Sequence, residues 1–237
     1  MKFQPPLASA RLVKRYKRFL ADVVLDDGGP ITCAVPNTGS MMGLTDPGSR
    51  VWLSKSDNPK RKLAYTFELI QTAGGLVGVN TGHPNAIVEE AIKSGAISEL
   101  AGYASLRREV RYGENSRIDL YLEDPGKGIC YAEVKNVHLK RDDGPNPGAA
   151  EFPDAVTKRG AKHLVELGDM VAGGARAVML YLVQRGDCDR LKLCRDLDPA
   201  YCAAFDRAAS AGVEAIAIRC QITQNEIIPE KTIPVEE

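Results

Sequence analysis

Two short apolar segments in the middle of the chain carry charged residues that packing alone would not require. Segment 117–124 alternates apolar and polar residues, and segment 129–139 does the same after the turn residues Asp124, Pro125 and Gly126. Alternation with a period of two is typical of β-strands, and Asp-Pro-Gly is typical of a tight turn. The pattern therefore predicts two strands that pair across a short turn and carry charges on a largely apolar surface.

The period of two places Glu133 and Lys135 on one face of the second strand, and pairing across the turn brings Asp119 alongside Glu133. Two neighbouring carboxylates repel each other unless a proton or a cation lies between them. Mg²⁺ suits such a site, because it takes oxygen ligands and keeps water molecules that a phosphate can replace. The three residues fit a metal-dependent nuclease in which Lys135 holds water or offsets charge on the phosphate. The spacing fits an ordinary surface Asp and a Glu/Lys pair equally well.

The 237-residue chain has equal numbers of acidic and basic residues, but their distribution is uneven. Residues 1–82 contain eleven Lys and Arg against six Asp and Glu, and the remainder carries the opposite excess. A basic N-terminal part suits a polyanion such as DNA, although a solvated basic strand face has the same composition. The basic residues predicted to contact nucleic acid are Lys14, Arg15, Lys17, Arg18, Lys55, Lys60, Arg61 and Lys62.

Residues 8–80 contain five or six short apolar segments separated by breakers rich in Gly, Pro and Asp. They predict a small antiparallel barrel of the OB-fold kind, a class that binds nucleic acid with basic and aromatic side chains. The loop after Pro36 adds Asn37 and Thr38, small polar residues that suit a phosphate or form an ordinary turn. The loop lacks the Lys-Ser/Thr of a nucleotide-binding P-loop, which argues against an ATPase.

Beyond residue 82 the pattern changes to alternating helices and strands. The near-continuous apolar segment 175–183 predicts a strand covered on both faces, and a further strand is expected at 213–222. Helices around these strands give a mixed sheet flanked by helices. We therefore predict a barrel domain over residues 1–82 and an α/β domain over residues 83–237.

The helix after the charged strands supplies three more candidate site residues. Asp154 is expected to cap this helix, and Arg159, Lys162 and His163 lie along it at helical spacing. Because the helix directly follows the Glu133 strand, Arg159 or His163 is placed to reach a phosphate there. Solvent-facing charges are the other interpretation of the same spacing.

The six cysteines form no CxxC pair, and only three histidines accompany them. The spacing lacks the paired ligands of a zinc site, so we expect reduced thiols without disulfide partners. The chain opens without the apolar segment of a signal peptide, and no run of about 18 apolar residues is present to cross a membrane. These features predict a soluble cytoplasmic protein and leave its oligomeric state open.

Several blocks of the sequence resemble one known family. In chain order they are KRYKRFLADV, NTGSM, KRKLAYTFEL, ISELAGYASL, SRIDLYL, YAEVKNVHL and FPDAVTKRGAKHLVEL. Together they resemble the sugar fermentation stimulation protein A (SfsA) family over essentially the whole chain. The acid on one strand and the Glu-x-Lys on the next also resemble the PD-(D/E)XK nuclease-like fold of many restriction and repair nucleases.

This resemblance implies an OB-like barrel joined to a PD-(D/E)XK-like domain. It also implies a DNA-binding protein with little sequence preference that regulates maltose and other sugar-utilisation genes. The site residues that it implies are Glu99, Asp119, Glu133, Lys135, Arg159, Lys162 and His163. The alternative function is an Mg²⁺- or Mn²⁺-dependent phosphodiesterase with Asp119, Glu133 and Glu99 as metal ligands.

Two departures from the family pattern accompany the resemblance. Ala34 and Val35 precede the Asn-Thr-Gly loop where relatives often carry a His-Cys pair, so no thiol or imidazole role is expected there. The loop between Lys140 and Phe152 is longer than in relatives, and its Pro and Gly content favours a mobile segment.

Overall fold

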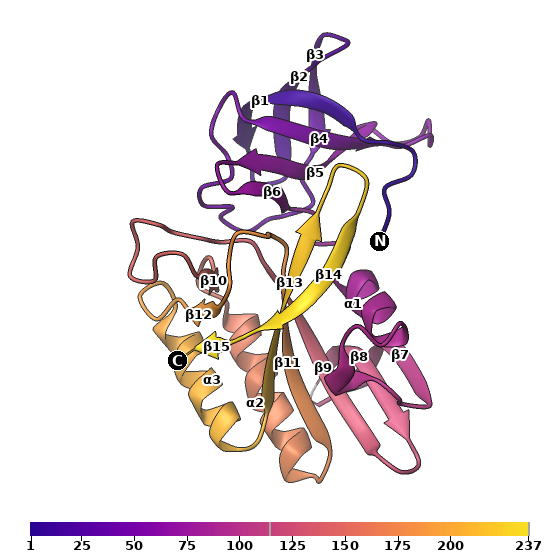
Figure 1. The fold of residues 1–237 in the computed structure, drawn as a ribbon, viewed down its shortest axis with the longest axis vertical. Coiled ribbons are helices and arrows are strands. Elements are labelled where there is room, and N and C mark those ends of the chain that lie inside the picture. The colour runs from indigo at the N-terminus through magenta and orange to yellow at the C-terminus, as the bar shows by residue number, and fades with distance from the viewer. Residues whose placement is uncertain (114, 237) are drawn as a thin grey trace.

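Six strands near the start of the chain form a closed barrel. The computed structural model describes residues 1–113 and 115–236, and Figure 1 shows the barrel at the top. Its strands are β1 (Ala8–Tyr16), β2 (Leu20–Leu25), β3 (Pro30–Ala34), β4 (Arg50–Lys55), β5 (Tyr65–Thr72) and β6 (Gly75–Gly78). They lie in the order β3-β2-β1-β4-β5-β6, and a pairing of β3 with β5 closes the barrel. Alternate apolar residues fill the interior, so the predicted barrel is confirmed.

A second six-stranded sheet forms the lower half of the molecule. Its strands are β7 (Ser105–Tyr112), β8 (Ser116–Asp124), β9 (Gly128–Val137), β11 (Arg176–Val183), β13 (Glu214–Ile222) and β14 (Ile227–Ile233). The three central strands β9, β11 and β13 are parallel, whereas β7, β8 and β14 are antiparallel to their neighbours. The mixed sheet expected from the sequence is thus confirmed.

Helices cover both faces of this sheet (Figure 1). α2 (Lys158–Ala172) and α3 (Pro199–Ser210) bury their apolar sides on one face. α1 (Pro84–Lys93) and a 3₁₀ turn (Ser98–Leu100) pack on the other. Three short strands that the sequence did not indicate form a separate sheet, namely β10 (Ala150–Phe152), β12 (Leu191–Leu193) and β15 (Val235–Glu236).

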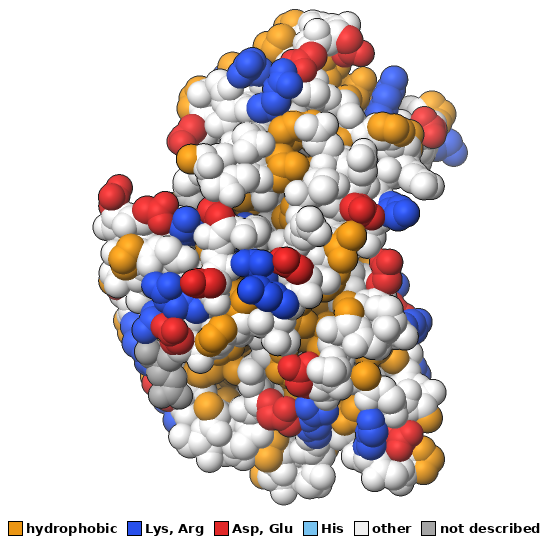
Figure 2. Space-filling model, viewed as in Figure 1, with side chains coloured by type: hydrophobic (Ala, Val, Ile, Leu, Met, Phe, Trp, Pro, Cys, Tyr) orange, Lys and Arg blue, Asp and Glu red, His pale blue; other side chains and the backbone are white. Residues whose placement is uncertain are grey.

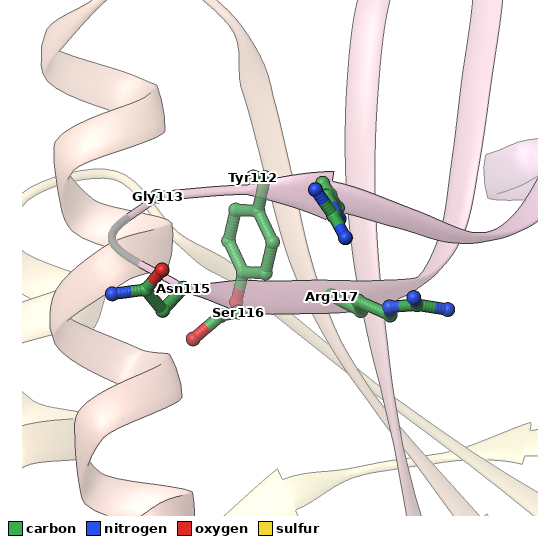
Figure 3. Close-up of a pocket in the computed structure, with 6 residues that line it drawn as sticks. Tyr112, Gly113, Asn115, Ser116 and Arg117 are labelled. Carbon is green, nitrogen blue, oxygen red and sulfur yellow. The ribbon is translucent and has the colours of Figure 1, made fainter.

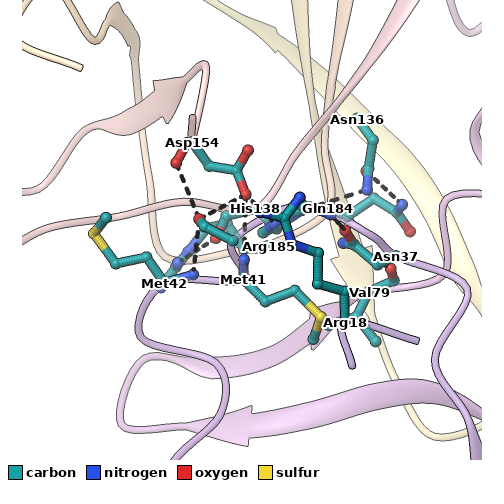
Figure 4. A network of polar contacts seen from close by, with 12 residues as sticks. Arg18, Asn37, Met41, Met42, Val79, Asn136, His138, Asp154, Gln184 and Arg185 are labelled. Atoms are coloured by element: carbon teal, nitrogen blue, oxygen red, sulfur yellow. Dashed lines mark hydrogen bonds and ion pairs between the residues drawn. The ribbon is translucent and has the colours of Figure 1, made fainter. Parts of the chain in front are cut away.

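The barrel and the second sheet are joined by one apolar core and by polar contacts. Trp52 and Leu69 of the barrel are buried together with α1 and the face of the sheet that α1 covers. Figure 4 shows Asp154 at the edge of this junction, near Met41 of the barrel loop. The Ser40 hydroxyl donates a 3.0 Å hydrogen bond to the Asp154 carboxylate. Burial alone would raise the pKa of Asp154, but His138 and Ser40 outweigh it and lower the pKa to about 2. A charged carboxylate therefore fixes the barrel loop to the second domain.

This role of Asp154 corrects the predicted start of α2. Thr157 is the N-cap of the helix, and its hydroxyl accepts a hydrogen bond from the backbone N–H of Gly160 at 3.1 Å. Asp154 lies three residues earlier, where the barrel loop takes its carboxylate instead. Val156 precedes the helix and is 68% exposed.

The first residues of the chain lie against the second sheet and not in the barrel. The backbone N–H of Phe3 donates to the carbonyl of Asn225 at 2.8 Å, and Lys2 forms a β-bridge with Glu226. The chain thus touches the second domain before it enters the barrel. A division at residue 82 describes the barrel strands but not these three residues.

The loop between Lys140 and Phe152 is anchored rather than mobile. The Arg141 guanidinium forms two hydrogen bonds to the carboxylate of Glu151, at 2.7 and 2.8 Å, and a third at 2.6 Å to Asp196. Glu151 is only 1% exposed. A bidentate, buried pair of this kind fixes the loop against the small three-stranded sheet.

All six cysteines are free and buried. Burial raises the pKa of the Cys33 and Cys220 thiols to about 12, so both remain protonated and unreactive. Within the part of the chain that the structure describes, no helix has the length and apolar character needed to cross a membrane.

Candidate carboxylate site

Asp119, Glu133 and Lys135 meet where β8 and β9 separate. The paired register of the two strands ends one residue after Asp119. There Asp119 Oδ2 accepts a 2.8 Å hydrogen bond from the backbone N–H of Val134, in place of the next bond of the ladder. Glu133 and Lys135 share one face of β9, with Lys135 Nζ 2.7 Å from Glu133 Oε1. The structure brings together the two carboxylates and the ammonium that the sequence pattern indicated.

Glu133 is 2% exposed, and one of its oxygens has no hydrogen-bond partner in the part of the chain that the structure describes. Oε1 accepts hydrogen bonds from Lys135 and from Nδ1 of His163, whereas the buried Oε2 has no hydrogen-bond partner among the described residues. Arg159 donates to Nε2 of His163 at 3.3 Å, so the imidazole carries its proton on Nδ1. Burial raises the pKa of Glu133, but His163 and Lys135 outweigh it and hold the pKa below its ordinary value. Glu133 is thus a charged carboxylate with one free oxygen.

Asp119 has the opposite electrostatic character. Its Oδ1 accepts a 2.8 Å hydrogen bond from the amide of Asn85 in the first turn of α1. Burial, and then the charge of Glu133, raise the pKa of Asp119 to about 6 despite the hydrogen bonds from Val134 and Asn85. The two carboxylates therefore titrate far apart, and both are ionised only above about pH 6.

We expect Asp119→Asn to stabilise the protein at neutral pH. Because the native pKa lies above the unfolded one, the native state binds more protons between about pH 4 and pH 6, and wild-type stability falls as the pH rises through that window. The asparagine variant lacks this loss, so its advantage should be near zero at pH 4 and reach about 3 kcal/mol at pH 8. Thermal unfolding of both proteins across this range measures the difference. A stability difference between the variant and wild type that does not vary with pH would contradict the raised pKa of Asp119.

Glu99 does not join these carboxylates. It is exposed on the 3₁₀ turn, and its backbone carbonyl accepts a hydrogen bond from Arg176 at the start of β11. Glu133 pairs with Met179 of the same strand. Met179 lies three residues beyond Arg176, about 10 Å away at the rise of a β-strand. Among the described residues, no group of three or more His, Cys, Asp or Glu side chains is arranged to hold a metal ion. The structure therefore does not support Glu99 as a third ligand.

The remaining pair still fits one kind of cation. Mg²⁺ or Mn²⁺ needs only one or two carboxylates, since water and a substrate phosphate complete its shell. The orphaned Oε2 of Glu133 and the neighbouring Asp119 supply that donor set. An uncompensated buried carboxylate oxygen is costly, and a cation would satisfy it.

The turn between β7 and β8 contributes site residues that the sequence analysis missed. Figure 3 shows Tyr112, Asn115 and Ser116 gathered at this turn beside α2. The hydroxyl of Tyr112 is buried without a hydrogen-bond partner in the described chain, and burial followed by nearby Glu133 and Glu166 raises its pKa. The Ser116 hydroxyl donates a 2.8 Å hydrogen bond to Glu166. No motif marks these residues, because a turn of this kind has ordinary strand and loop composition.

Two adjoining hollows open at this turn. One, of about 460 Å³, is lined by Arg111, Tyr112, Gly113, Asn115, Ser116 and Arg117. The other, of about 410 Å³, shares Asn115, Ser116 and Arg117 and continues to Glu109, Arg159, Lys162 and His163. The second hollow reaches His163, whose imidazole contacts Glu133, whereas Asp119, Glu133 and Lys135 line neither of these two hollows.

Two of the predicted nucleic-acid contacts are internal. Asn37 is 2% exposed, donates to the carbonyl of Val79 at 3.2 Å and accepts the N–H of Gly39. The Arg15 guanidinium donates to four backbone carbonyls, those of Arg18, Asn37, Gly39 and Ser40. Both side chains shape the loop after Pro36 and are not presented to a ligand. The structure therefore corrects both assignments.

Three of the other basic residues gather around one hollow of the barrel. Lys17, Arg61 and Lys62 line a cavity of about 690 Å³ together with Phe19, which is 53% exposed. The other predicted contacts are exposed outside this cavity and are Lys14, Arg18, Thr38, Lys55 and Lys60. On the face shown in Figure 2, basic and acidic groups lie side by side, so no continuous basic surface covers it.

Comparison with known proteins gives consistent matches along the chain. The model of the SfsA N-terminal OB domain matches residues 13–79, and that of the sugar fermentation stimulation protein RE domain matches residues 82–226. Sugar fermentation stimulation protein homologs from Brucella ovis and Agrobacterium fabrum are 59% and 55% identical to it over 237 residues, covering 100% of this chain and 98% of each relative. The solved structure of Pyrococcus furiosus SfsA in complex with Ca²⁺ matches with a TM-score of 0.89 at 25% identity, covering 100% of this chain and 98% of that one.

Proposed function

The chain belongs to the sugar fermentation stimulation protein family, and from that premise we propose that it binds DNA with little sequence preference and cleaves phosphodiester bonds at its carboxylate site. The observation that carries the proposal is the buried, charged Glu133 with one unpartnered oxygen beside Asp119. A pure DNA-binding surface gains nothing from two carboxylates that face a polyanion unless a cation lies between them.

Glu133 and Asp119 would hold Mg²⁺ or Mn²⁺ in this proposal. The relative from Pyrococcus furiosus was solved with Ca²⁺, which supports a divalent cation without identifying the one used here. When bound, such an ion supplies Lewis acidity and neutralises charge on the phosphodiester. The pKa of Asp119 near 6 means that the full negative charge of the site is present only above that pH.

The other side chains of the site have distinct roles. The Lys135 ammonium is 14% exposed and is placed to offset charge that develops on the phosphate oxygens. His163 is 4% exposed and bonded to Glu133, so it positions that carboxylate instead of contacting the substrate. Arg159 is exposed, lines the hollow that reaches His163, and donates a hydrogen bond to Nε2 of that histidine.

The hollow of the barrel would hold the nucleic acid. Lys17, Arg61 and Lys62 provide phosphate contacts that carry no sequence information, and exposed Phe19 offers a face for an unstacked base. Such contacts give an affinity that falls steeply with salt.

We expect simultaneous replacement of Lys17, Arg61 and Lys62 by glutamine to weaken binding to all DNA sequences alike. The slope of log affinity against log salt should become shallower by about two to three, the value for three lost phosphate contacts. Fluorescence anisotropy with two unrelated oligonucleotides over a salt series measures both effects. Arg50→Gln is the matched control, because Arg50 is exposed on the same barrel but paired with Asp26 at 3.0 Å. Equal losses in the control and the triple variant would contradict a binding role for this hollow.

A DNA-binding regulator of sugar-utilisation genes that does not cleave is the second candidate. It is favoured by Asp119, whose two oxygens already accept hydrogen bonds from Val134 and Asn85. Incubation of the pure protein with single-stranded, duplex and branched DNA, with and without Mg²⁺ or Mn²⁺, separates the two. Binding without cleavage selects the regulator, and metal-dependent products select the nuclease.

We place this activity in the cytoplasm. Six free, buried cysteines suit a compartment that keeps thiols reduced. DNA, the proposed partner, is present there in bacterial cells.

A further inference from the structure

The hairpin of β7 and β8 carries two arginines that face each other and have no acidic partner among the described residues. Arg111 pairs directly with Arg117 in the register of the two strands. Residues opposite each other in an antiparallel pair lie on the same face within about 5 Å, and like charges there destabilise the sheet. Both side chains are exposed, and neither has a hydrogen bond or ion pair to another described residue. The repulsive pair therefore lies in the hairpin of β7 and β8, next to the carboxylate site.

The other two arginines of β7 differ. Arg107 lies 3.6 Å from the carboxylate of Glu123, and Arg108 lies 3.1 Å from that of Glu89. All four arginines are exposed and belong to one hairpin. Exposure on this hairpin therefore does not by itself explain why Arg111 and Arg117 differ from Arg107 and Arg108. An unpaired, opposed couple of guanidinium groups is a ready receptor for an anion, because each presents a fork of N–H donors.

The position of the couple relates it to the carboxylates. Both arginines line the hollow of about 460 Å³, and Arg117 also lines the adjoining hollow that leads to His163. Figure 3 shows Arg117 on β8, beyond Ser116 and away from the turn. Arg117 precedes Asp119 by two residues, which separates their Cα atoms by about 6–7 Å along the strand. That separation is comparable to the step between consecutive phosphates of a nucleic-acid strand.

We propose that Arg111 and Arg117 form an anion site that grips the phosphate next to the one facing Asp119 and Glu133. This inference rests on the proposed function, because it takes the ligand to be the backbone of a nucleic-acid strand. It assigns to the two arginines the positioning of the strand across the carboxylate site. Asn115, with its neutral amide donors, and Tyr112 line the same hollow. Its volume of about 460 Å³ is the space assigned to the sugar-phosphate chain.

The first test uses inorganic phosphate and needs no nucleic acid. Thermal unfolding of the whole protein is followed while sodium phosphate is titrated at constant ionic strength, with chloride as the reference. Wild type and Arg107→Gln should gain stability with phosphate, and the double variant Arg111→Gln/Arg117→Gln should not. Without phosphate the double variant should melt no lower than wild type, since a repulsive pair has been removed. Equal phosphate stabilisation of wild type and the double variant would overturn the site.

The second test measures the affinity for a short single-stranded oligodeoxynucleotide by anisotropy over a salt series. The double variant should bind at least about tenfold more weakly at low salt, with a log–log salt slope shallower by about 1.4 for two lost contacts to a single strand. The double control Arg107→Gln/Arg108→Gln, which has the same net charge as the double variant Arg111→Gln/Arg117→Gln, should bind within about twofold of wild type. A loss in this control as large as that in the double variant would overturn the proposal, because bulk charge would explain both.

The outcomes distinguish this inference from the function on which it rests. DNA binding or cleavage that is unchanged in the double variant overturns the arginine site and leaves the proposed function standing. Absence of any DNA binding by wild type at low salt overturns the proposed function and, with it, the role of the arginines on a nucleic-acid strand.

Discussion

Replacing Glu133 with glutamine is expected to lower metal-dependent cleavage of DNA by about 10³-fold, the range for loss of one group that stabilises charge in a reaction. Glutamine keeps an oxygen that accepts the hydrogen bonds of Lys135 and His163, so the local packing is retained. It removes the negative charge and replaces the unpartnered Oε2 by a donor that cannot hold a cation. Affinity for DNA should be unchanged or higher, because a charge that repels phosphate is lost.

A second test of the Glu133→Gln variant measures metal binding through thermal stability and does not depend on cleavage. Added Mg²⁺ or Mn²⁺ should raise the melting temperature of wild type above pH 6 and leave that of Glu133→Gln unchanged. Glu123→Gln is the matched control, since Glu123 lies on the adjoining strand, is 51% exposed and pairs only loosely with Arg107. Equal cleavage by Glu133→Gln and wild type, in preparations free of contaminating nuclease, would remove the catalytic half of the proposal.

The largest expected loss of stability comes from Arg141→Ala, at about 3–5 kcal/mol. The variant leaves the carboxylate of Glu151, whose side chain is 0% exposed, without its bidentate partner. For a chain of this length such a loss corresponds to a fall of about 10 °C in melting temperature. Chemical or thermal unfolding measures it, with Arg50→Ala as the control because the exposed Arg50–Asp26 pair should cost less than about 1 kcal/mol.

A double variant separates the pair from its neighbours. Arg141→Met combined with Glu151→Leu removes both buried charges and should recover most of the stability, because an apolar pair avoids the cost of desolvation. If Arg141→Ala costs no more than Arg50→Ala, the loop between Lys140 and Phe152 is not held by this contact.

The strand that carries Glu133 and Lys135 was predictable because the pattern that defines it is local. A strand places residues i and i+2 on one face whatever surrounds it, so the neighbouring positions of Glu133 and Lys135 follow from the sequence. The strict alternation fails one strand away. Ile118 packs in the core under α2, whereas Leu120 and Leu122 pack under α1, because β8 leaves the ladder at Asp119. A local break of this kind has no signal in the order of apolar residues.

Other misses share a tertiary cause. Asp154 is a residue type that commonly caps helices. Its carboxylate instead accepts a hydrogen bond from a barrel loop more than a hundred residues earlier in the chain. Arg15 is a basic residue among basic residues, yet its partners are backbone carbonyls, which every residue possesses and no sequence pattern marks. Arg111 and Arg117 become informative only once the register shows that they face each other and the contacts of the described residues give neither an acidic partner.

The apolar core shared by Trp52, Leu69 and the helix-covered sheet has a mechanical consequence. If a flexible linker joined the barrel to the second domain, a nucleic-acid strand bound to the barrel could reach many positions on that domain. Here the barrel and the second sheet share one apolar core, so the barrel hollow and Asp119 lie on parts of the chain that this core joins directly. Under the proposed function, a strand bound in the barrel hollow would meet the carboxylates at a set distance from that hollow, and this distance would determine the length of the cleaved product.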